Sequence, residues 1–245
     1  MKQEIFTVTQ NKPLTRDVYE MTLHGDISAI TAPGQFVNLL LEGFYLRRPI
    51  SVCETVGTDT LRLIYKTVGR GTEKMAGMTP GQTVDLLVGL GNGYDLSAAG
   101  AHPLLVGGGV GVPPLYQLAK ELRAKGKPVT VILGFNTERE IFLDESFRSL
   151  GCEVFLSTAD GSRGKQGFVT DAMRDVADYS YLYTCGPLPM LRAVYDACTT
   201  GGEFSFEERM GCGFGACMGC SCKTKSGSKR ICKEGPVLKK EEILW

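Results

Sequence analysis

The sequence predicts an all-β N-terminal region, a central α/β region with a parallel sheet, and a small cysteine-rich segment at the C-terminal end. Three observations support this prediction. Short apolar runs recur between turn residues early in the chain, strand-like and helix-like runs then alternate, and five of the nine cysteines fall within residues 207–236. A chain of 245 residues is long enough for two domains. We place the boundaries at residues 1–99, 100–205 and 206–245.

Residues 1–99 carry short apolar runs of the kind that form strands. These runs cover residues 5–9, 18–23, 35–41, 60–66 and 83–89. Turn-forming dipeptides such as Pro33-Gly34 and Pro80-Gly81 separate them. Strands this closely spaced predict either a barrel or a sandwich.

Residues 100–205 alternate between strand-like and helix-like runs. The strand-like runs cover residues 102–109, 128–135, 152–158 and 179–186. The helix-like runs cover residues 115–126, 168–177 and 187–200. This alternation is typical of βαβ units and predicts a Rossmann-like parallel sheet.

The overall charge and the lack of an apolar leader narrow the class of protein. Lys plus Arg and Asp plus Glu each number 27, which argues against a chain that binds nucleic acid. The sequence has no run of 18 apolar residues and begins without the core of an export signal. We therefore expect a cytoplasmic chain with no membrane span. In such a reducing compartment, clustered cysteines are more often metal ligands or redox groups than disulfides.

The spacing of the C-terminal cysteines predicts an iron–sulfur site. Cys212, Cys217 and Cys220 follow the Cys-x4-Cys-x2-Cys pattern of plant-type [2Fe-2S] proteins, which take a fourth cysteine from further downstream. We prefer Cys232 to Cys222 as that fourth ligand, because Cys222 is only two residues from Cys220. A zinc site with four cysteine ligands is the main alternative, although such sites often use two Cys-x2-Cys pairs. The remaining alternative is that these cysteines are inert thiols that bind no metal.

A glycine-rich turn lies between the first strand and the first helix of the central region. Residues 107–111 would let backbone N–H groups approach a pyrophosphate at the start of a helix. The turn is not a regular Gly-x-Gly-x-x-Gly, and the acidic ribose-binding residue expected after the next strand is replaced by Gly134, Phe135 and Asn136. On this motif alone, the alternative interpretation is a tight βα turn that binds no ligand.

Two features of the N-terminal region are suited to a phosphorylated cofactor. Arg47 and Arg48 precede a Pro-Ile-Ser strand, and arginines can neutralise phosphate through paired hydrogen bonds. Gly71 and Thr72 mark a turn where a short helix can start beside such a phosphate. An exposed basic hairpin is the alternative. With only two histidines in the chain, we expect the chemistry to reside in cofactors.

Together these motifs resemble the ferredoxin–NADP reductase superfamily. An Arg-Pro-x-Ser strand, a Gly-Thr turn, GGGVGVPP and CGPLPM occur in that order, and the resemblance covers essentially the whole chain. The tail EERMGCGFGACMGCSC, followed by RICKEGPVL, is similar to the electron-transfer subunits of class 1B dihydroorotate dehydrogenases. The resemblance implies an antiparallel FAD-binding β-barrel, a nicotinamide-nucleotide domain and a small [2Fe-2S] domain.

The resemblance also implies roles for individual residues. The FAD-binding positions would be Arg47, Arg48, Pro49, Ile50, Ser51, Tyr65, Lys66, Thr67, Gly71 and Thr72. The nicotinamide-nucleotide positions would be Gly107, Gly108, Gly109, Gly111, Pro113, Cys185, Gly186 and Pro187, with Met190 nearby. The cluster ligands would be Cys212, Cys217, Cys220 and Cys232. Ile50 departs from the family pattern, which often has Tyr there, so the stacking on the flavin would differ.

The activity implied by the resemblance is electron transfer in pyrimidine (UMP) biosynthesis. An FMN-containing catalytic subunit would oxidise dihydroorotate, and electrons would pass through the [2Fe-2S] cluster and FAD of this chain to NAD⁺. The assembly would be a heterotetramer with two of each subunit, and the acid–base residues for dihydroorotate would belong to the partner. One alternative is the FAD/[2Fe-2S] subunit of another NAD(P)H:ferredoxin-type complex. Another is a zinc-stabilised binding module.

Overall fold

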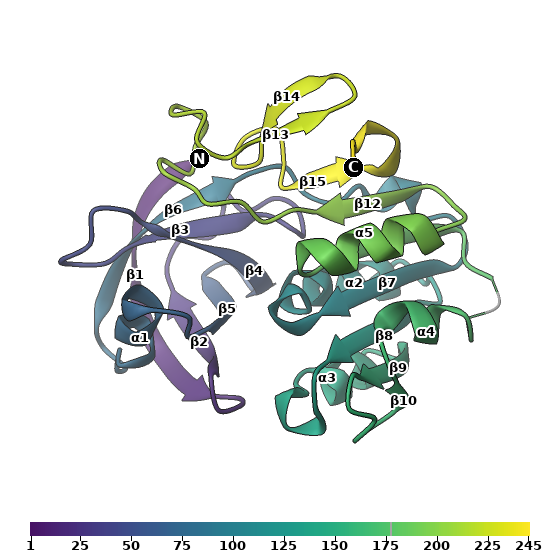
Figure 1. The fold of residues 1–245 in the computed structure, drawn as a ribbon. Helices are drawn as coiled ribbons and strands as arrows, with labels where there is room; N and C mark the ends of the chain where they lie inside the picture. The colour runs from purple at the N-terminus through teal and green to yellow at the C-terminus, as the bar shows by residue number, and fades with distance from the viewer. Residues whose placement is uncertain (177) are drawn as a thin grey trace.

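A closed β-barrel and an α/β sheet lie side by side, and the C-terminal part of the chain lies across both (Figure 1). The computed structural model describes residues 1–176 and 178–245. The predicted fold class is confirmed, and the choice between barrel and sandwich is settled in favour of the barrel. In the described part of the chain, no helix is long and apolar enough to cross a membrane.

The barrel is antiparallel and has the strand order β1-β2-β5-β4-β3-β6. Its interior is filled by alternate side chains such as Phe6, Met21 and Leu86, all of which are fully buried. Met75 on helix α1 (Arg70–Ala76) packs into the same core. The strands are β1 (Lys2–Pro13), β2 (Val18–His24), β3 (Phe36–Leu40), β4 (Arg48–Val56), β5 (Thr60–Lys66) and β6 (Thr83–Leu90).

The second sheet has seven strands in the order β10-β9-β8-β7-β11-β12-β15, and every neighbouring pair is parallel except β12 with β15. Its strands are β7 (Pro103–Gly108), β8 (Thr130–Phe135), β9 (Glu153–Thr158), β10 (Lys165–Gln166), β11 (Tyr181–Cys185), β12 (Gly202–Ser205) and β15 (Val237–Lys239). The predicted parallel sheet is therefore confirmed.

Helices cover both faces of this sheet, as Rossmann-like folds require. Apolar side chains of α2 (Pro113–Ala124) and α3 (Asp144–Ser149) share one core with one face. Those of α4 (Val169–Met173) and α5 (Leu188–Ala197) share a second core with the other face. The helix predicted over residues 168–177 corresponds to α4, and residue 177 lies outside the described residues. Short 3-10 turns are η1 (Leu96–Ala99), η2 (Gly109–Gly111), η3 (Glu138–Glu140) and η4 (Lys240–Glu242).

A buried ionic network joins the barrel to helix α2. Arg62 on β5 contacts Glu20 at 3.3 Å and Glu54 at 3.0 Å, and Glu54 also contacts Lys120 on α2 at 2.5 Å. The Arg62 guanidinium lies 4.7 Å from the centre of the Tyr116 ring, also on α2. Because these charges are half-buried or buried, removing one partner would leave the other poorly solvated. The network therefore fixes how the sheet sits against the barrel.

The C-terminal segment, residues 206–245, is held between the barrel and the sheet. It contains the hairpin of β13 (Ser221–Thr224) and β14 (Gly227–Arg230), and it then adds β15 to the edge of the larger sheet. Cys220, Ile231 and Cys232 are buried in one core with Phe36 of the barrel and Phe204 of the sheet. The apolar side chains of this segment therefore pack against those of the barrel and the sheet, and do not form a separate core. The domain boundaries at residues 99 and 205 stay predictions.

Asn92, just after β6, ties the barrel to this segment. Its side-chain amide donates to the carbonyl oxygens of Val237 at 2.7 Å and Glu234 at 3.3 Å. Its carbonyl oxygen accepts from the backbone N–H of Val237 at 3.0 Å. The side chain thus pairs with β15 as a strand backbone would.

We expect Asn92→Ala to lower the free energy of unfolding by about 1–3 kcal/mol, because it removes three hydrogen bonds to the C-terminal segment. Urea unfolding followed by circular dichroism measures this loss. Asn136→Ala is the matched control, since the exposed amide of Asn136 bonds to Glu140 at 2.9 Å and its loss should cost less than about 0.5 kcal/mol. Equal losses of unfolding free energy in the two variants would mean that Asn92 does not hold the C-terminal segment in place.

Candidate functional site

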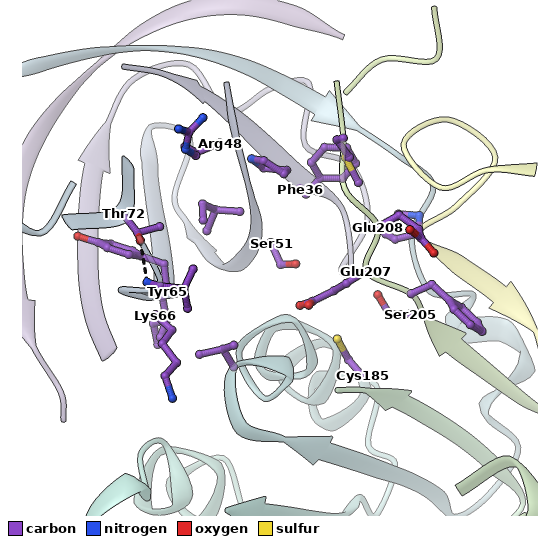
Figure 2. Close-up of a pocket in the computed structure, with 18 residues that line it drawn as sticks. Phe36, Arg48, Ser51, Tyr65, Lys66, Thr72, Cys185, Ser205, Glu207 and Glu208 are labelled. Atoms are coloured by element: carbon purple, nitrogen blue, oxygen red, sulfur yellow. Dashed lines mark hydrogen bonds between the residues drawn. The ribbon is translucent and has the colours of Figure 1, made fainter. Parts of the chain in front are cut away.

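A cavity of about 340 Å³ lies where the barrel, the sheet and the C-terminal segment meet (Figure 2). One wall comes from strands β4 and β5 of the barrel, and the other from the ends of β11 and β12 and the chain that follows β12. The residues from the barrel side are Phe36, Arg48, Pro49, Ile50, Ser51, Ile64, Tyr65, Lys66, Val68 and Thr72. Those from the other side are Val110, Cys185, Ser205, Phe206, Glu207, Glu208, Met210 and Pro236.

Many of the sequence-predicted site residues line this cavity. They are Arg48, Pro49, Ile50, Ser51, Tyr65, Lys66, Thr72 and Cys185. Sequence reasoning missed the wall at the end of β12 and directly after it, which is formed by Ser205, Phe206, Glu207, Glu208 and Met210. The available signal was their position, because ligands of open α/β sheets bind at the carboxyl ends of the strands.

One end of the cavity is shaped by Arg48 and the turn before α1. The backbone of Gly71 lies so close to Arg48 that a Cβ atom there would be 2.2 Å from the Arg48 Nε. Thr72 Oγ1 accepts a hydrogen bond from the N–H of Val68 at 2.9 Å and donates to the carbonyl of Gly69 at 3.0 Å. Thr72, in the first turn of α1, thus holds the preceding turn closed, and Gly71 leaves room for Arg48, which lines the cavity (Figure 2). A fixed guanidinium of this kind is suited to a phosphate group.

Arg47 is not at the cavity, although it precedes Arg48. Its guanidinium lies 2.7 Å from a carboxylate oxygen of Asp85 and donates to the backbone carbonyls of Asp85 and Asn38, each at 3.2 Å. Thr67 also lies outside the cavity lining, since its hydroxyl and its N–H both donate to the carbonyl of Asp17. Of the two arginines, the structure brings only Arg48 to the cavity.

The opposite end of the cavity is lined by a hydroxyl, a thiol and carboxyl groups. Ser51, Cys185 and Glu207 lie around it in Figure 2. Burial raises the pKa of the Cys185 thiol to about 12, and burial also raises the pKa of the Glu207 carboxyl above its usual value. A thiol and a hydroxyl beside apolar side chains are suited to an uncharged ring system, and the carboxyl groups of Glu207 and Glu208 also line this part of the cavity. The cavity therefore has a guanidinium at one end and a thiol, a hydroxyl and two carboxyl groups at the other.

The glycine turn after β7 packs against the turn after β11. A Cβ atom on Gly111 would lie 2.4 Å from the carbonyl oxygen of Cys185, and one on Gly108 would lie 2.4 Å from the Met190 sulfur. A side chain at either position would clash, with the backbone of Cys185 in one case and with the side chain of Met190 in the other. Pro113 begins α2 and Pro187 precedes α5, so each turn leads into a helix. Gly107, Gly109 and Gly186 belong to the same two turns. None of the predicted glycines and prolines of these turns lines the cavity itself.

The cysteine loop, residues 211–220, lies over the barrel beside the cavity. The Cys212 N–H donates to the Cys217 sulfur at 3.4 Å, and the Ala216 N–H donates to the Cys212 sulfur at 3.2 Å. The Cys232 N–H donates to the Cys220 sulfur at 3.4 Å. The four predicted ligands thus form two neighbouring pairs, while Cys222 lies on β13. All nine cysteines are free thiols.

The donors of this loop fit an iron–sulfur cluster in type and in their backbone surroundings. Burial opposes ionisation of Cys212, but hydrogen bonds from Phe214, Cys217 and Ala216 outweigh it and lower the pKa of this thiol to about 6. Thiolates that accept backbone N–H groups are the ligands such clusters use. Within residues 1–176 and 178–245, no three metal-ligating side chains converge on one point, so the two pairs define the site only in part.

The chain matches two family models. The iron–sulfur cluster binding domain of dihydroorotate dehydrogenase B matches residues 207–244. The oxidoreductase NAD-binding domain matches residues 105–196. These matches cover the cysteine loop and the glycine turn.

Curated relatives match the chain from end to end. It is 43% identical to the dihydroorotate dehydrogenase B (NAD(+)) electron transfer subunit of Geobacillus sp. (strain WCH70), over 100% of this chain and 99% of the relative. It is 42% identical to the protein of the same name from Fusobacterium nucleatum subsp. nucleatum, over 97% of this chain and 96% of the relative.

Solved structures share the fold. A structure of an NADH-dependent reduced ferredoxin-NADP oxidoreductase superposes with a TM-score of 0.89 at 28% identity, over 98% of this chain and 90% of that one. A ferredoxin NADP⁺ reductase from Neisseria gonorrhoeae with bound FAD and NADP superposes with a TM-score of 0.70 at 18% identity, over 80% of this chain and 90% of that one. The second likeness concerns the fold alone.

We expect Gly111→Ala to lower the free energy of unfolding by about 3 kcal/mol, because its Cβ would meet the backbone of Cys185 and Gly186. Gly109→Ala, in the same turn, should cost only about 1 kcal/mol, because its φ of +52° is strained for alanine but open space surrounds it. Thermal unfolding of the two variants checks the difference. A smaller loss in Gly111→Ala than in Gly109→Ala would mean that the two turns do not pack closely.

Proposed function

This chain belongs to the family of dihydroorotate dehydrogenase B (NAD(+)) electron transfer subunits, and we propose that it carries electrons from dihydroorotate oxidation to NAD⁺. The observation that supports this most directly is the cavity, whose lining includes Val110 of the glycine turn and Met210, which directly precedes the cysteine loop. A redox group bound in that cavity could accept electrons from the cysteine loop and pass them to a nicotinamide at the glycine turn. The resulting activity is that of an oxidoreductase subunit in pyrimidine biosynthesis.

The cavity would hold FAD with its two ends in opposite surroundings. Arg48, Gly71 and Thr72 would bind the pyrophosphate, because the guanidinium and the tight turn provide positive charge and close backbone approach. Ser51 and Cys185 would border the isoalloxazine ring, where burial excludes water. The remaining predicted contacts are those of Pro49, Ile50, Tyr65 and Lys66. Arg47 and Thr67 would act only indirectly, since they face other groups.

The glycine turn would receive NAD⁺. Of the four predicted glycines, Gly107, Gly108 and Gly111 pack against neighbouring groups, while open space surrounds Gly109. Cys185, Gly186 and Pro187 form the neighbouring turn at the carboxyl edge of the sheet. Pro113 begins the helix behind the glycine turn.

The cysteine loop would hold a [2Fe-2S] cluster through Cys212, Cys217, Cys220 and Cys232. The contact between Cys232 and the Cys220 sulfur favours Cys232 over Cys222 as the fourth ligand. Together the cluster and FAD would supply one-electron and two-electron chemistry in one chain, which NAD⁺ requires because it accepts two electrons at once.

We propose that an FMN-containing catalytic subunit binds over the cysteine loop. Cys217 is exposed at the surface, and the apolar side chains of Phe214 and Met218 beside it are 43% and 53% exposed. A partner that covers them would bring its own redox group close to the cluster. The proposed assembly is a heterotetramer with two of each subunit, located in the cytoplasm.

The direct test is reconstitution with a dihydroorotate dehydrogenase B catalytic subunit. Together the two proteins should reduce NAD⁺ in the presence of dihydroorotate, and neither should do so alone. The likeness to an NADH-dependent reduced ferredoxin-NADP oxidoreductase favours a second candidate, in which the partner belongs to a ferredoxin-type complex. Activity with reduced ferredoxin and none with dihydroorotate would establish that candidate instead. A colourless, zinc-containing chain would support the binding module.

We expect Gly71→Ala to weaken FAD binding at least about tenfold, because its Cβ would displace the Arg48 guanidinium. Fluorescence of the flavin released on dialysis measures this loss. Gly69→Ala is the matched control, because open space surrounds that position. Equal FAD retention in both variants would remove Arg48 from the phosphate site.

We expect Cys217→Ser to lose most of its iron and keep FAD, because the loop and the cavity are separate sites. Cys222→Ser should retain wild-type iron content if Cys232 is the fourth ligand. Iron assays with absorption spectra measure both. Full iron content in Cys217→Ser would refute the proposed ligand set.

A further inference from the structure

A buried amide on the outer face of the barrel supports the cysteine loop. Side chains along β3 alternate, so Val37 and Leu39 fill the barrel while Phe36 packs outside it in the core of the C-terminal segment. Asn38 lies between Val37 and Leu39 and is only 1% exposed. It is therefore a polar side chain at a position where the barrel meets the cysteine loop, and its neighbour Phe36 on the same face is apolar.

The Asn38 amide touches the loop at its first predicted ligand. Its Nδ2 donates to the carbonyl oxygen of Cys212 at 3.3 Å. The next residue, Gly213, has a φ of +78°, and a Cβ atom there would lie 2.2 Å from the Asn38 Nδ2. The loop backbone therefore rests directly on this amide, and the glycine is what allows the approach.

The other half of the amide has no partner. Asn38 Oδ1 is buried and accepts no hydrogen bond from any residue that the structure describes. A buried amide oxygen without a donor is unfavourable, and a leucine of similar volume would fill this interface without that cost. An amide is suited to this position only if its nitrogen donates to the loop and its oxygen also receives a hydrogen bond. The cysteine loop would supply the missing donor.

Groups behind Asn38 hold its backbone in place. Arg47, which directly precedes β4, donates to the Asn38 carbonyl at 3.2 Å and pairs with Asp85 of β6 at 2.7 Å. Gln3 of β1 donates to the other carboxylate oxygen of Asp85 at 2.5 Å. Strands β1, β6, β3 and β4 are thereby linked behind the amide. This network also gives Arg47 a role other than the flavin contact expected from the sequence.

We propose that Asn38 is a positioning residue for the iron–sulfur cluster. Its Nδ2 fixes the Cys212 carbonyl and so the direction of the Cys212 thiol, and its Oδ1 accepts a backbone N–H of the cysteine loop once the cluster is bound. Groups that orient ligands from behind typically change metal affinity 10- to 100-fold when they are removed. The inference depends on the proposed cluster ligands, and it concerns this chain's own residues around them.

The test compares Asn38→Leu with the wild-type chain, both isolated without oxygen. We expect iron loss to a chelator to be about tenfold faster in the variant, and the EPR signal of the reduced cluster to shift or broaden. FAD content should stay unchanged, because Asn38 does not line the cavity. Gln117→Leu is the control, since the oxygen of that amide on α2 accepts from the backbone N–H of Thr55. It should leave iron loss and the EPR signal unaltered.

A second variant keeps the proposal testable if Asn38→Leu does not fold. Asn38→Asp retains an acceptor but removes the donor to Cys212, so it should also lose iron faster than wild type. Wild-type chelation rates and EPR signals in the variants that fold would overturn the positioning role while leaving the cluster itself in place. Absence of a cluster in the wild-type chain would instead overturn the proposed function.

Discussion

The packing of the chain after β12 against the outer face of the barrel is the constraint on which the rest of the structure depends. Phe36 of the barrel, Phe204 of the sheet and Cys220 of the C-terminal segment share one apolar core. That core brings three regions of different secondary structure around a single cavity. Without it, the cysteine loop would have no rigid support, because the segment has too few apolar residues for a core of its own. The proposed relay follows from this contact.

Charge is distributed in the cavity according to what each end would bind. Arg48 lies against the backbone of Gly71 at one end, while the thiol of Cys185 and the carboxyl groups of Glu207 and Glu208 line the other end. A ligand with a charged phosphate part and an uncharged aromatic part is complementary to this arrangement. The glycine turn and the cysteine loop are separate segments near this cavity. A group bound in the cavity could therefore exchange electrons with two different carriers that occupy different positions.

The sequence predicted the fold well where the pattern is local. Alternating apolar residues in the first region and βαβ alternation in the second follow from periodicity, and the spacing of the cysteines predicted a redox site that the family match bears out. Contacts between distant residues could not be predicted in this way. Neighbouring arginines looked equivalent in the sequence, yet strand β4 directs Arg48 to the cavity and Arg47 to Asp85. Glu207 begins the EERMGC tail motif but gained no role from it, and Asn38 belongs to no motif. Only the packing of the C-terminal segment places these two residues at the two sites.

A cofactor analysis of the chain purified without oxygen would test the proposed electron relay. An absorption spectrum would be combined with assays of flavin, iron, acid-labile sulfide and zinc. The relay requires about one FAD, two irons and two sulfides per chain. Zinc in place of iron, with no flavin, would contradict it.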